Sequence, residues 1–305
     1  MSNTSISVGI VGLGEIGTTF ARGLRAAGVS GVVAYDAYAS NGDFSELIRR
    51  RADEIGIRLA DSPADLAATT RLILDVTPGT VCEASAGAFK DVLQPEHSYV
   101  ALASTGPDTK TSIYEALQGT GANVCDGAIL GSPKDGHAMP IIISGPGANL
   151  VKDALSPLGM KIEVVSATVG AATAIKIIRS VITKGVEALL TEGLLAARRH
   201  SIDEYVVTSL SRIWSKPFEQ TVNNMLTTSV IHAERRAEEA TMSADTLKSL
   251  GLDSMMSEAT SQRLARTAQL GLKSQLGGEA PSDWREALRL IEEASAKAGR
   301  AHNIQ

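Results

Sequence analysis

One lysine stands out in an otherwise apolar stretch of the sequence. Lys176 lies in GAATAIKIIRS, residues 170–180, with isoleucines on both sides. In a helix that turns about 100° per residue, the polar residues sharing its face are Arg179, Ser180, Thr183 and Glu187. Such a stripe is usually the solvent side of a surface helix. Its narrowness favours a second interpretation, in which burial and the neighbouring Arg179 lower the lysine pKa, so that Lys176 acts as a general acid or base.

Three glycines at close spacing follow an apolar segment near the N-terminus. The sequence ISVGIVGLGEIGTTFARGL, residues 6–24, is typical of a strand, a tight turn and the start of a helix. Gly12 would close the turn, Gly14 would let a pyrophosphate approach the backbone, and Gly17 would let the helix pack on the sheet. The free amides at the helix N-terminus would then bind phosphate. The alternative is a glycine-rich turn with a purely structural role.

An acidic residue ends the second predicted strand, GVVAYD. Asp36 follows the glycines by about 20 residues, where a dinucleotide site has a carboxylate that binds the adenosine ribose. This carboxylate would repel a 2′-phosphate, and neither Ala37 nor Tyr38 supplies the arginine that an NADP site would normally place nearby. The sequence therefore predicts NAD as the cofactor and leaves NADP possible.

Two later loops should reach the same site. The segments DVTPG (75–79) and LASTGPDT (102–109) each follow an apolar strand, and ligands of open α/β sheets lie off the carboxyl ends of strands. Thr77, Ser104 and Thr105 would face the nicotinamide end of the cofactor. Alternatively, Ser104 and Thr105 only cap the helix that follows, or they do both. The residues expected to bind the cofactor are Gly12, Leu13, Gly14, Glu15, Ile16, Gly17, Asp36, Thr77, Pro78, Ser104 and Thr105.

The first half of the chain alternates predicted strands with predicted helices. Strands are expected at 6–11, 32–35, 71–76, 99–103, 122–125, 139–145 and 160–166. Helices are expected at 15–28, 44–55, 80–91, 107–118 and from about residue 148. This alternation predicts a mostly parallel sheet, and hence an α/β Rossmann-type domain over residues 1–166.

The character of the sequence changes after residue 166. Residues 169–200 contain no proline and predict one long helix, apolar on most sides, which indicates burial within a domain or at a subunit interface. The remaining sequence stays helical. Residues 167–305 are therefore expected to form an all-α substrate and dimerisation domain, and the chain to be a homodimer.

Composition excludes several classes of protein. The 305 residues are 44% hydrophobic and 21% charged, with a net charge of −5, which argues against binding to nucleic acid or to an anionic membrane surface. We expect a cytoplasmic protein without a membrane-spanning segment or a metal site. Cys82 and Cys125 have no CxxC partner and are expected to be reduced core residues. Trp214 and Phe218 are expected to pack in the core.

The ordered set of motifs resembles the β-hydroxyacid dehydrogenase superfamily, which includes 3-hydroxyisobutyrate and 6-phosphogluconate dehydrogenases. The matching segments are GLGEIG (12–17), VTPG (76–79), STGPDT (104–109), DGAILGSP (126–133) and GAATAIK (170–176). The resemblance implies an NAD(P)-dependent oxidoreductase acting on CH–OH groups. It also implies that a substrate hydroxyl loses its proton toward Lys176 while hydride passes to the nicotinamide. The C-terminal half looks like that of a subgroup whose helical domain is of unknown function.

The substrate loop of this chain departs from the family pattern D-x-P-V-S-G-G. Leu130 stands where the family has a serine that contacts substrate, and Arg179 and Ser180 stand where asparagines are usual. These departures suggest a small anionic substrate with an apolar or aromatic portion. The residues expected to bind it are Ser104, Asp126, Gly127, Ile129, Leu130, Arg179, Ser180, His232 and Arg235.

A basic cluster occurs in the segment SVIHAERRAEEA. His232, Arg235 and Arg236 fall on one side of a helix. In related dehydrogenases the second subunit contributes basic groups to the substrate pocket, which makes His232 and Arg235 candidates for that role. The alternative is an exposed helix face on which glutamates pair with the arginines.

Two other functions remain open. The protein could be a dinucleotide-binding sensor or regulatory protein without turnover, or a ketone or imine reductase acting on a neutral substrate. Lys176 favours an enzyme, because a pure binding protein has no need of a desolvated lysine. A lysine rather than an aspartate or tyrosine at this position weakens the imine-reductase interpretation.

Overall fold

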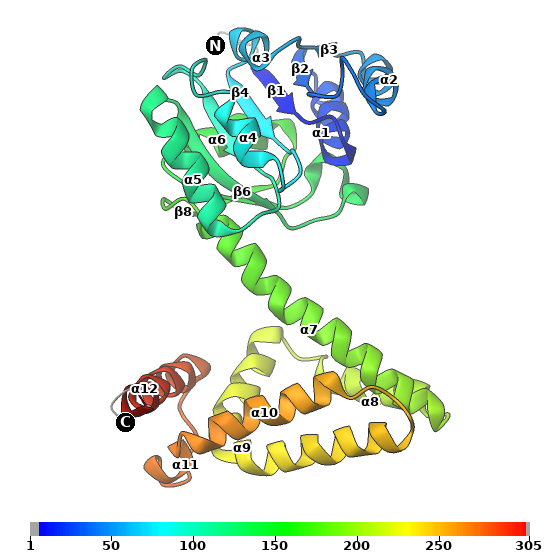
Figure 1. Cartoon of the computed structure of the whole chain (residues 1–305), viewed down its shortest axis with the longest axis vertical. Coiled ribbons are helices and arrows are strands. Elements are labelled where there is room, and N and C mark those ends of the chain that lie inside the picture. The colour runs from blue at the N-terminus through cyan, green and yellow to red at the C-terminus, as the bar shows by residue number, and fades with distance from the viewer. Residues whose placement is uncertain (1–5, 303–305) are drawn as a thin grey trace. The chain divides into compact units, whose positions relative to one another are not determined.

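The computed structural model describes residues 6–302. The chain divides into two compact units after Val181. The first unit is a sheet with helices on both faces, and the second is built from helices (Figure 1). The expected fold class, a Rossmann-type α/β domain followed by an all-α region, is confirmed.

The sheet of the first unit is mostly parallel. Its strands are β1 (Ser7–Val11), β2 (Gly31–Tyr35), β3 (Arg58–Leu59), β4 (Leu72–Asp75), β5 (Ser98–Ala101), β6 (Asn123–Ile129), β7 (Ile141–Ser144) and β8 (Ile162–Ser166). Among the described residues they run in the order β3-β2-β1-β4-β5-β6-β7-β8. Only the β6–β7 pair in this series is antiparallel. The strand order reverses between β1 and β4, and ligands of such sheets bind at this point.

Helices cover both faces of the sheet (Figure 1). They are α1 (Glu15–Ala26), α2 (Ser45–Ile55), α3 (Pro63–Thr69), α4 (Cys82–Gly87), α5 (Pro107–Leu117) and α6 (Ala148–Leu155), with 3₁₀ turns η1 (Gln118–Thr120), η2 (Pro133–Ala138) and η3 (Ser156–Leu158). The sequence pattern missed β3 and α3, because elements of two and seven residues are too short to show a clear period. Strand β6 runs four residues past its expected end, since residues 126–129 pair with β7.

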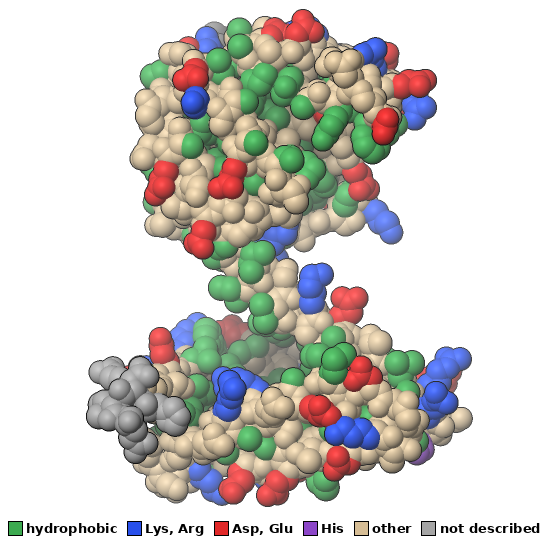
Figure 2. Space-filling view, viewed as in Figure 1, with side chains coloured by type: hydrophobic (Ala, Val, Ile, Leu, Met, Phe, Trp, Pro, Cys, Tyr) green, Lys and Arg blue, Asp and Glu red, His purple; other side chains and the backbone are tan. Residues whose placement is uncertain are grey.

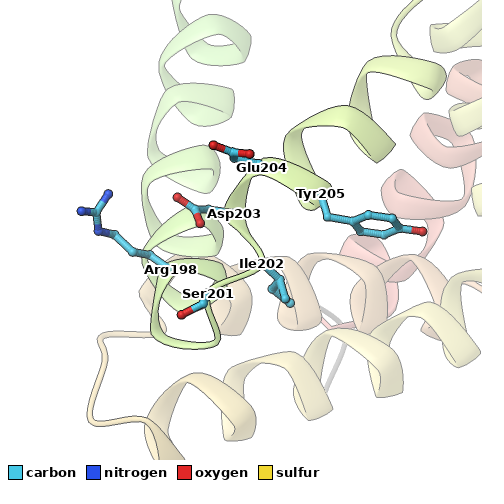
Figure 3. Close-up of a pocket in the computed structure, with 6 residues that line it drawn as sticks. All are labelled: Arg198, Ser201, Ile202, Asp203, Glu204 and Tyr205. Carbon is cyan, nitrogen blue, oxygen red and sulfur yellow. The ribbon is translucent and has the colours of Figure 1, made fainter.

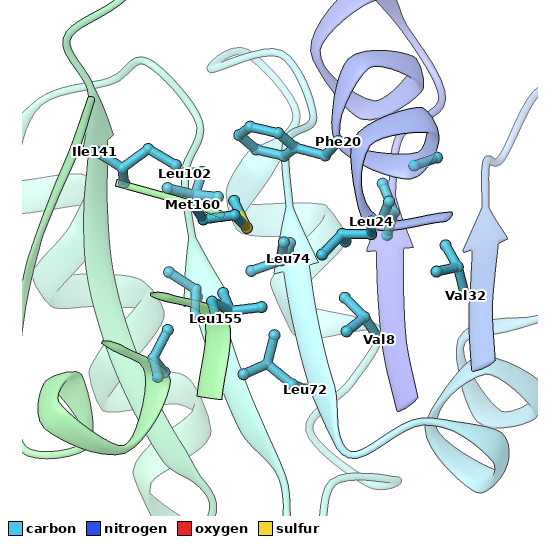
Figure 4. Packing of buried hydrophobic residues seen from close by; sticks show 14 of the residues in the cluster. Val8, Phe20, Leu24, Val32, Leu72, Leu74, Leu102, Ile141, Leu155 and Met160 are labelled. Carbon is cyan, nitrogen blue, oxygen red and sulfur yellow. The ribbon is translucent and has the colours of Figure 1, made fainter. Parts of the chain in front are cut away.

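Each face of the sheet has its own hydrophobic core. Successive side chains of a strand point to opposite faces, so Leu72 and Leu74 of β4 pack under α1 and α6, whereas Ile73 packs with Phe89 and Tyr99 on the other side. Figure 4 shows the first of these cores. The two cysteines are buried free thiols, as expected. Burial raises the pKa of Cys125 to about 12.

The helix α7 (Ala171–Arg199) begins in the first unit and continues into the second. The other helices of the second unit are α8 (Asp203–Ile213), α9 (Phe218–Ser249), α10 (Met255–Gln269), α11 (Leu272–Gln275) and α12 (Trp284–His302). Their core forms where α9 meets α11 and α12, around Val230, Ile231, Leu272 and Ala287. No helix in the described part of the chain is long and apolar enough to cross a membrane.

The expectation that Trp214 and Phe218 pack in the core was wrong. They are 53% and 69% exposed, because they flank the short α8–α9 connection and the core is built from residues further along α9. The long helix was expected to be buried within a domain or at a subunit interface, and within the single chain it is not buried. Ile178 and Val181 of α7 are 63% and 70% exposed.

Candidate active site

The glycine loop between β1 and α1 is shaped by close backbone contacts. Gly12 has a φ of +90°, a conformation that favours glycine, and its N–H donates to the Tyr35 carbonyl at 2.8 Å. A Cβ at Gly17 would lie 2.0 Å from the Gly12 carbonyl oxygen, whereas a Cβ at Gly14 would meet nothing within 4 Å. Gly12 and Gly17 thus have the backbone roles expected of them. The N-terminus of α1 has no side-chain cap, so its first amides can bind an anion.

A cavity of about 620 Å³ lies against this loop, and we call it the glycine-loop cavity. Of the residues expected to bind a cofactor, those that line it are Gly12, Leu13, Gly14, Glu15, Ile16, Asp36, Thr77 and Pro78. Its lining also includes Tyr38, Phe44 and Arg51, which sequence reasoning did not assign to the site. Tyr38 and Phe44 meet edge to face, with ring centroids 6.4 Å apart. Gly17, Ser104 and Thr105 are not in its lining.

The carboxylate of Asp36 is held by backbone amides. Its Oδ2 accepts a hydrogen bond from the Leu13 N–H at 2.8 Å, and its Oδ1 accepts one from the Tyr38 N–H at 3.0 Å. A carboxylate oxygen has two lone pairs. Each oxygen can therefore accept a further hydrogen bond from a ligand hydroxyl.

A second carboxylate, that of the buried Asp75, holds the VTPG loop. Asp75 Oδ1 accepts hydrogen bonds from the N–H and the hydroxyl of Thr77 at 2.9 and 2.6 Å, and its Oδ2 accepts one from the hydroxyl of Tyr99. Burial, more than the adjacent Asp75 charge, raises the pKa of Tyr99 well above its ordinary value, so the phenol stays protonated as a donor. The sequence did not identify this network, since Tyr99 lies in the middle of an apolar strand.

Lys176 contacts Ser104 in the loop between β5 and α5. The Lys176 Nζ donates a hydrogen bond to the Ser104 Oγ at 2.7 Å. Burial lowers the pKa of Lys176. A Cβ at Gly79 would lie 2.2 Å from the Ser104 carbonyl, so the VTPG loop packs directly on the loop that carries Ser104. Helix α5 has Gly106 at its N-cap and no side-chain cap, so the interpretation of Ser104 and Thr105 as capping residues is wrong.

Asp126, which was expected to bind substrate, has its carboxylate turned into the protein interior in this structure. Its carboxylate is buried and accepts hydrogen bonds from the N–H and the hydroxyl of Thr173 at 2.9 and 2.6 Å. It accepts a third hydrogen bond from the Ser144 hydroxyl at 3.3 Å. The buried Lys110 Nζ lies 3.5 Å from Asp126 Oδ1 and also donates to the carbonyls of Ala101 and Gly127. Asp126 therefore anchors the first turn of α7 to the sheet.

The remaining residues expected to bind substrate differ in their surroundings. Gly127 is buried, and a Cβ there would lie 2.5 Å from Leu102 Cδ2. Ile129 is half-buried at the end of β6. Leu130 packs against a small apolar cluster formed by Ala128, Ile142 and Ala172. The other two, Arg179 and Ser180, lie about one turn beyond Lys176 on α7.

The basic cluster of the second unit is on the surface of α9. His232 and Arg235 are exposed. Arg235 forms an ion pair with Glu239 one turn along the helix, and Arg236 Nη2 donates to the Thr228 hydroxyl at 2.8 Å. Within one chain, these contacts are those of the alternative interpretation, an exposed helix face on which a glutamate pairs with an arginine.

The second unit has a cavity of about 650 Å³ at the turn between α7 and α8 (Figure 3). Its lining includes the basic Arg198 and the acidic Asp203 and Glu204. Ser201 closes the turn with a φ of +57°. Across the described residues, no group of histidine, cysteine and acidic side chains could hold a metal ion.

Family models match both parts of the chain. Residues 7–166 match the NAD binding domain of 6-phosphogluconate dehydrogenase, and residues 197–267 match a domain of unknown function, DUF1932.

Solved structures share the fold over nearly the whole chain. A conserved hypothetical protein from Sinorhizobium meliloti is 30% identical, with a TM-score of 0.62 over 95% of this chain and 97% of that one. A conserved protein of unknown function, described as structurally similar to 3-hydroxyacid dehydrogenases, is 29% identical, with a TM-score of 0.61 over 90% of this chain and 99% of that one. At 16% identity, an imine reductase from Myxococcus stipitatus in complex with NADP⁺ has a TM-score of 0.71 over 93% of this chain and 99% of its own.

These matches confirm the resemblance stated from the motifs. Together with the glycine-loop cavity, they indicate an NAD(P)-dependent oxidoreductase. The chain belongs to the family built on the NAD-binding domain of 6-phosphogluconate dehydrogenase, joined here to a DUF1932 domain.

Proposed function

We propose that the protein transfers hydride between NAD(P) and a hydroxy or keto group of a small anionic substrate, with Lys176 as general acid and base. The observation that carries this proposal is the 2.7 Å contact between Lys176 Nζ and Ser104 Oγ. A lysine with a lowered pKa next to a hydroxyl, at the carboxyl ends of the strands, suits proton transfer to or from a substrate oxygen.

The residues of the glycine-loop cavity fit a dinucleotide. The open space at Gly14 admits a pyrophosphate, the uncapped amides of α1 suit its charge, and the Asp36 carboxylate has lone pairs for ribose hydroxyls. When bound, the nicotinamide would supply the hydride acceptor or donor. Asp36 favours NAD over NADP.

Lys176 would handle the proton. In the oxidative direction the neutral amine accepts the proton of the substrate hydroxyl, and in the reductive direction the ammonium returns it to the oxygen. Burial favours the neutral amine, which is the form that accepts a proton. Ser104 would hold the Lys176 amine and share the hydrogen bond to the substrate oxygen.

The substrate would be anionic and partly apolar. Arg179 follows Lys176 on the same helix and is the group we assign to a substrate carboxylate or phosphate. The half-buried Leu130, in place of a serine, would contact an apolar portion. We assign residues 1–166 to cofactor binding and residues 167–305 to substrate binding and dimerisation.

The surface of α7 supports a homodimer. Apolar side chains are exposed along this helix (Figure 2). They include Ile178, Val181, Ile182, Leu189, Leu190 and Leu195, which are between 39% and 70% exposed. A second copy of the chain would cover them, and His232 and Arg235 would then be available to the partner's substrate.

Ligand-induced stabilisation tests the cofactor first. Thermal melting is measured with NAD, NADH, NADP and NADPH, and then with hydroxy and keto acids in the presence of NAD(H). A ligand at 100 times its Kd adds about 2.7 kcal/mol of stability, so the Tm should rise by several degrees. No shift with any nucleotide would overturn the proposal.

The role of Lys176 is tested with any acid that the screen identifies. Lys176→Met should leave cofactor binding intact and lower kcat by roughly 10²- to 10⁴-fold. Lys184→Met, on the same helix, is the matched control and should retain activity. Turnover that survives Lys176→Met would exclude this lysine as the acid and base.

A further inference from the structure

The glycine-loop cavity contains a cation that the sequence did not associate with it. We propose that Arg51 of α2 is a subsite for a 2′-phosphate, so that the cavity accepts NADP(H) as well as NAD(H). This inference rests on the proposed function of the cavity as the dinucleotide site. Among the described residues that line the cavity, Arg51 is the one basic side chain.

Arg51 and Asp36 contact the same residue of the glycine loop. The Leu13 N–H donates to Asp36 Oδ2 at 2.8 Å, and the Leu13 carbonyl accepts from Arg51 Nη1 at 3.0 Å. The carboxylate and the guanidinium therefore bind the amide nitrogen and the carbonyl oxygen of one and the same residue of the glycine loop. A ribose bound at Asp36 would therefore have its 2′ position within the reach of Arg51.

The contact to Leu13 leaves Arg51 with donors for a ligand. A guanidinium carries five N–H donors in a planar fork that matches the oxygens of a phosphate, and one of these donors is used by the Leu13 carbonyl. That contact also restrains the side chain, which lowers the entropic cost of binding a phosphate.

The fold holds this arrangement in place. Helix α2 is anchored to the core through the buried Ile48 and Ala52 on either side of Arg51 in sequence. Arg49, two residues before Arg51, donates to the carbonyls of Ala39 and Ser40 at 2.9 and 3.1 Å. The loop that follows Asp36 is thereby tied to the same helix that carries Arg51.

The charges in the cavity oppose one another. Asp36 and Glu15 repel a 2′-phosphate, and Arg51 attracts it. NADP(H) should therefore bind through Arg51 against the charge of Asp36, and the two residues together set the ratio of the two cofactor affinities.

Direct binding measurements test the assignment without a substrate. The Kd values of NADH and NADPH are measured by fluorescence titration, and those of AMP and adenosine 2′,5′-bisphosphate by calorimetry. Arg51→Gln should weaken binding of NADPH and the bisphosphate tenfold or more relative to NADH and AMP. Asp36→Asn should have the opposite effect and strengthen binding of NADPH relative to NADH. Higher salt should weaken NADPH binding more than NADH binding in the parent protein.

The matched control is Arg50→Gln. Arg50 belongs to the same helix but pairs with Glu54 and does not line the cavity, so removing its charge should leave the ratio within about twofold. An unchanged ratio in Arg51→Gln, or a parent protein that binds NADH but not NADPH, overturns the inference and leaves the proposed function standing. A parent protein that binds neither cofactor overturns the proposed function itself.

Discussion

Thr173 donates both its backbone N–H and its hydroxyl to the buried carboxylate of Asp126, at 2.9 and 2.6 Å. The first turn of α7 is thereby capped by a side chain from strand β6 rather than by its own N-cap residue. Lys176 lies one turn further along this helix. The position of its amine relative to Ser104 therefore depends on how Asp126 seats the helix.

Removing the Thr173 hydroxyl should change the environment of the Lys176 amine. Thr173→Val keeps the shape of the side chain but loses one hydrogen bond to Asp126, so the helix start should loosen and Lys176 should become better solvated. The pH dependence of amine acylation at Lys176, followed by mass spectrometry, should move to higher pH, toward that of an ordinary lysine. Thr173→Ser should restore the parent profile.

The matched control for this experiment is Thr191→Val. Thr191 is on the same helix, and its hydroxyl donates to the Glu187 carbonyl one turn back. This variant should leave the Lys176 profile unchanged. A profile that is also unchanged in Thr173→Val would show that Asp126 does not position Lys176.

The ion pair between Lys110 and Asp126 should be important for stability. Both side chains are fully buried, and removal of one partner leaves an uncompensated charge that costs about 3–5 kcal/mol. Lys110→Met should lower the free energy of unfolding by that amount in urea denaturation followed by circular dichroism.

A surface pair provides the comparison for Lys110→Met. Lys248 and Glu258 are 54% and 44% exposed, so Lys248→Met should cost far less stability than Lys110→Met, because solvent screens an exposed ion pair. Equal losses in the two variants would contradict the special role of the buried pair.

Two glycines of the same loop should respond differently to alanine. Gly17→Ala would place a Cβ 2.0 Å from the Gly12 carbonyl, so the loop must shift and stability should fall by about 1–3 kcal/mol. Gly14→Ala meets only open space in the free protein. It should melt normally and lose affinity for NAD(H), because the added methyl occupies the space of the pyrophosphate.

Stability and cofactor affinity together distinguish the packing role of Gly17 from the cofactor-binding role of Gly14. Thermal melting without ligand and NADH titration, performed on both glycine variants, give the two readouts. Normal NADH affinity in Gly14→Ala would argue against a pyrophosphate at this position.

The pH dependence of turnover should reflect the lysine. Oxidation needs the neutral amine of Lys176, so kcat should rise with pH and level off as the amine loses its proton. Because burial lowers the pKa of Lys176, the midpoint of the rise should lie below about 10.4, the ordinary value for lysine. Reduction needs the ammonium and should show the opposite dependence. A kcat for oxidation that does not vary with pH while chemistry limits the rate would contradict the assignment.

The charge of the substrate can be tested at Arg179. If this arginine binds a substrate anion, Arg179→Ala should raise KM about tenfold or more and affect kcat less, since the contact is made in both the ground state and the transition state. A neutral ketone or imine substrate would show little change. Steady-state kinetics with one substrate in both proteins distinguishes these outcomes.

The local pattern of the sequence was sufficient to predict the fold class and the dinucleotide-binding family. The strand, the glycines and the helix of residues 6–24 depend on neighbouring residues only, since backbone sterics and side-chain periodicity act over a few positions. The same holds for the long helix that carries Lys176. The short elements β3 and α3 escaped prediction for the converse reason, because they contain too few residues to show a period.

The contacts within the site were decided by the tertiary structure. Lys176 and Ser104 are 72 positions apart, and Arg51 meets the glycine loop from a separate helix. Asp126 has a suitable residue type for a substrate ligand, but the antiparallel β7 and the start of α7 enclose it and use its oxygens. A sequence specifies which side chains are available, whereas their partners depend on which strands lie side by side, and that order results from packing of the whole sheet.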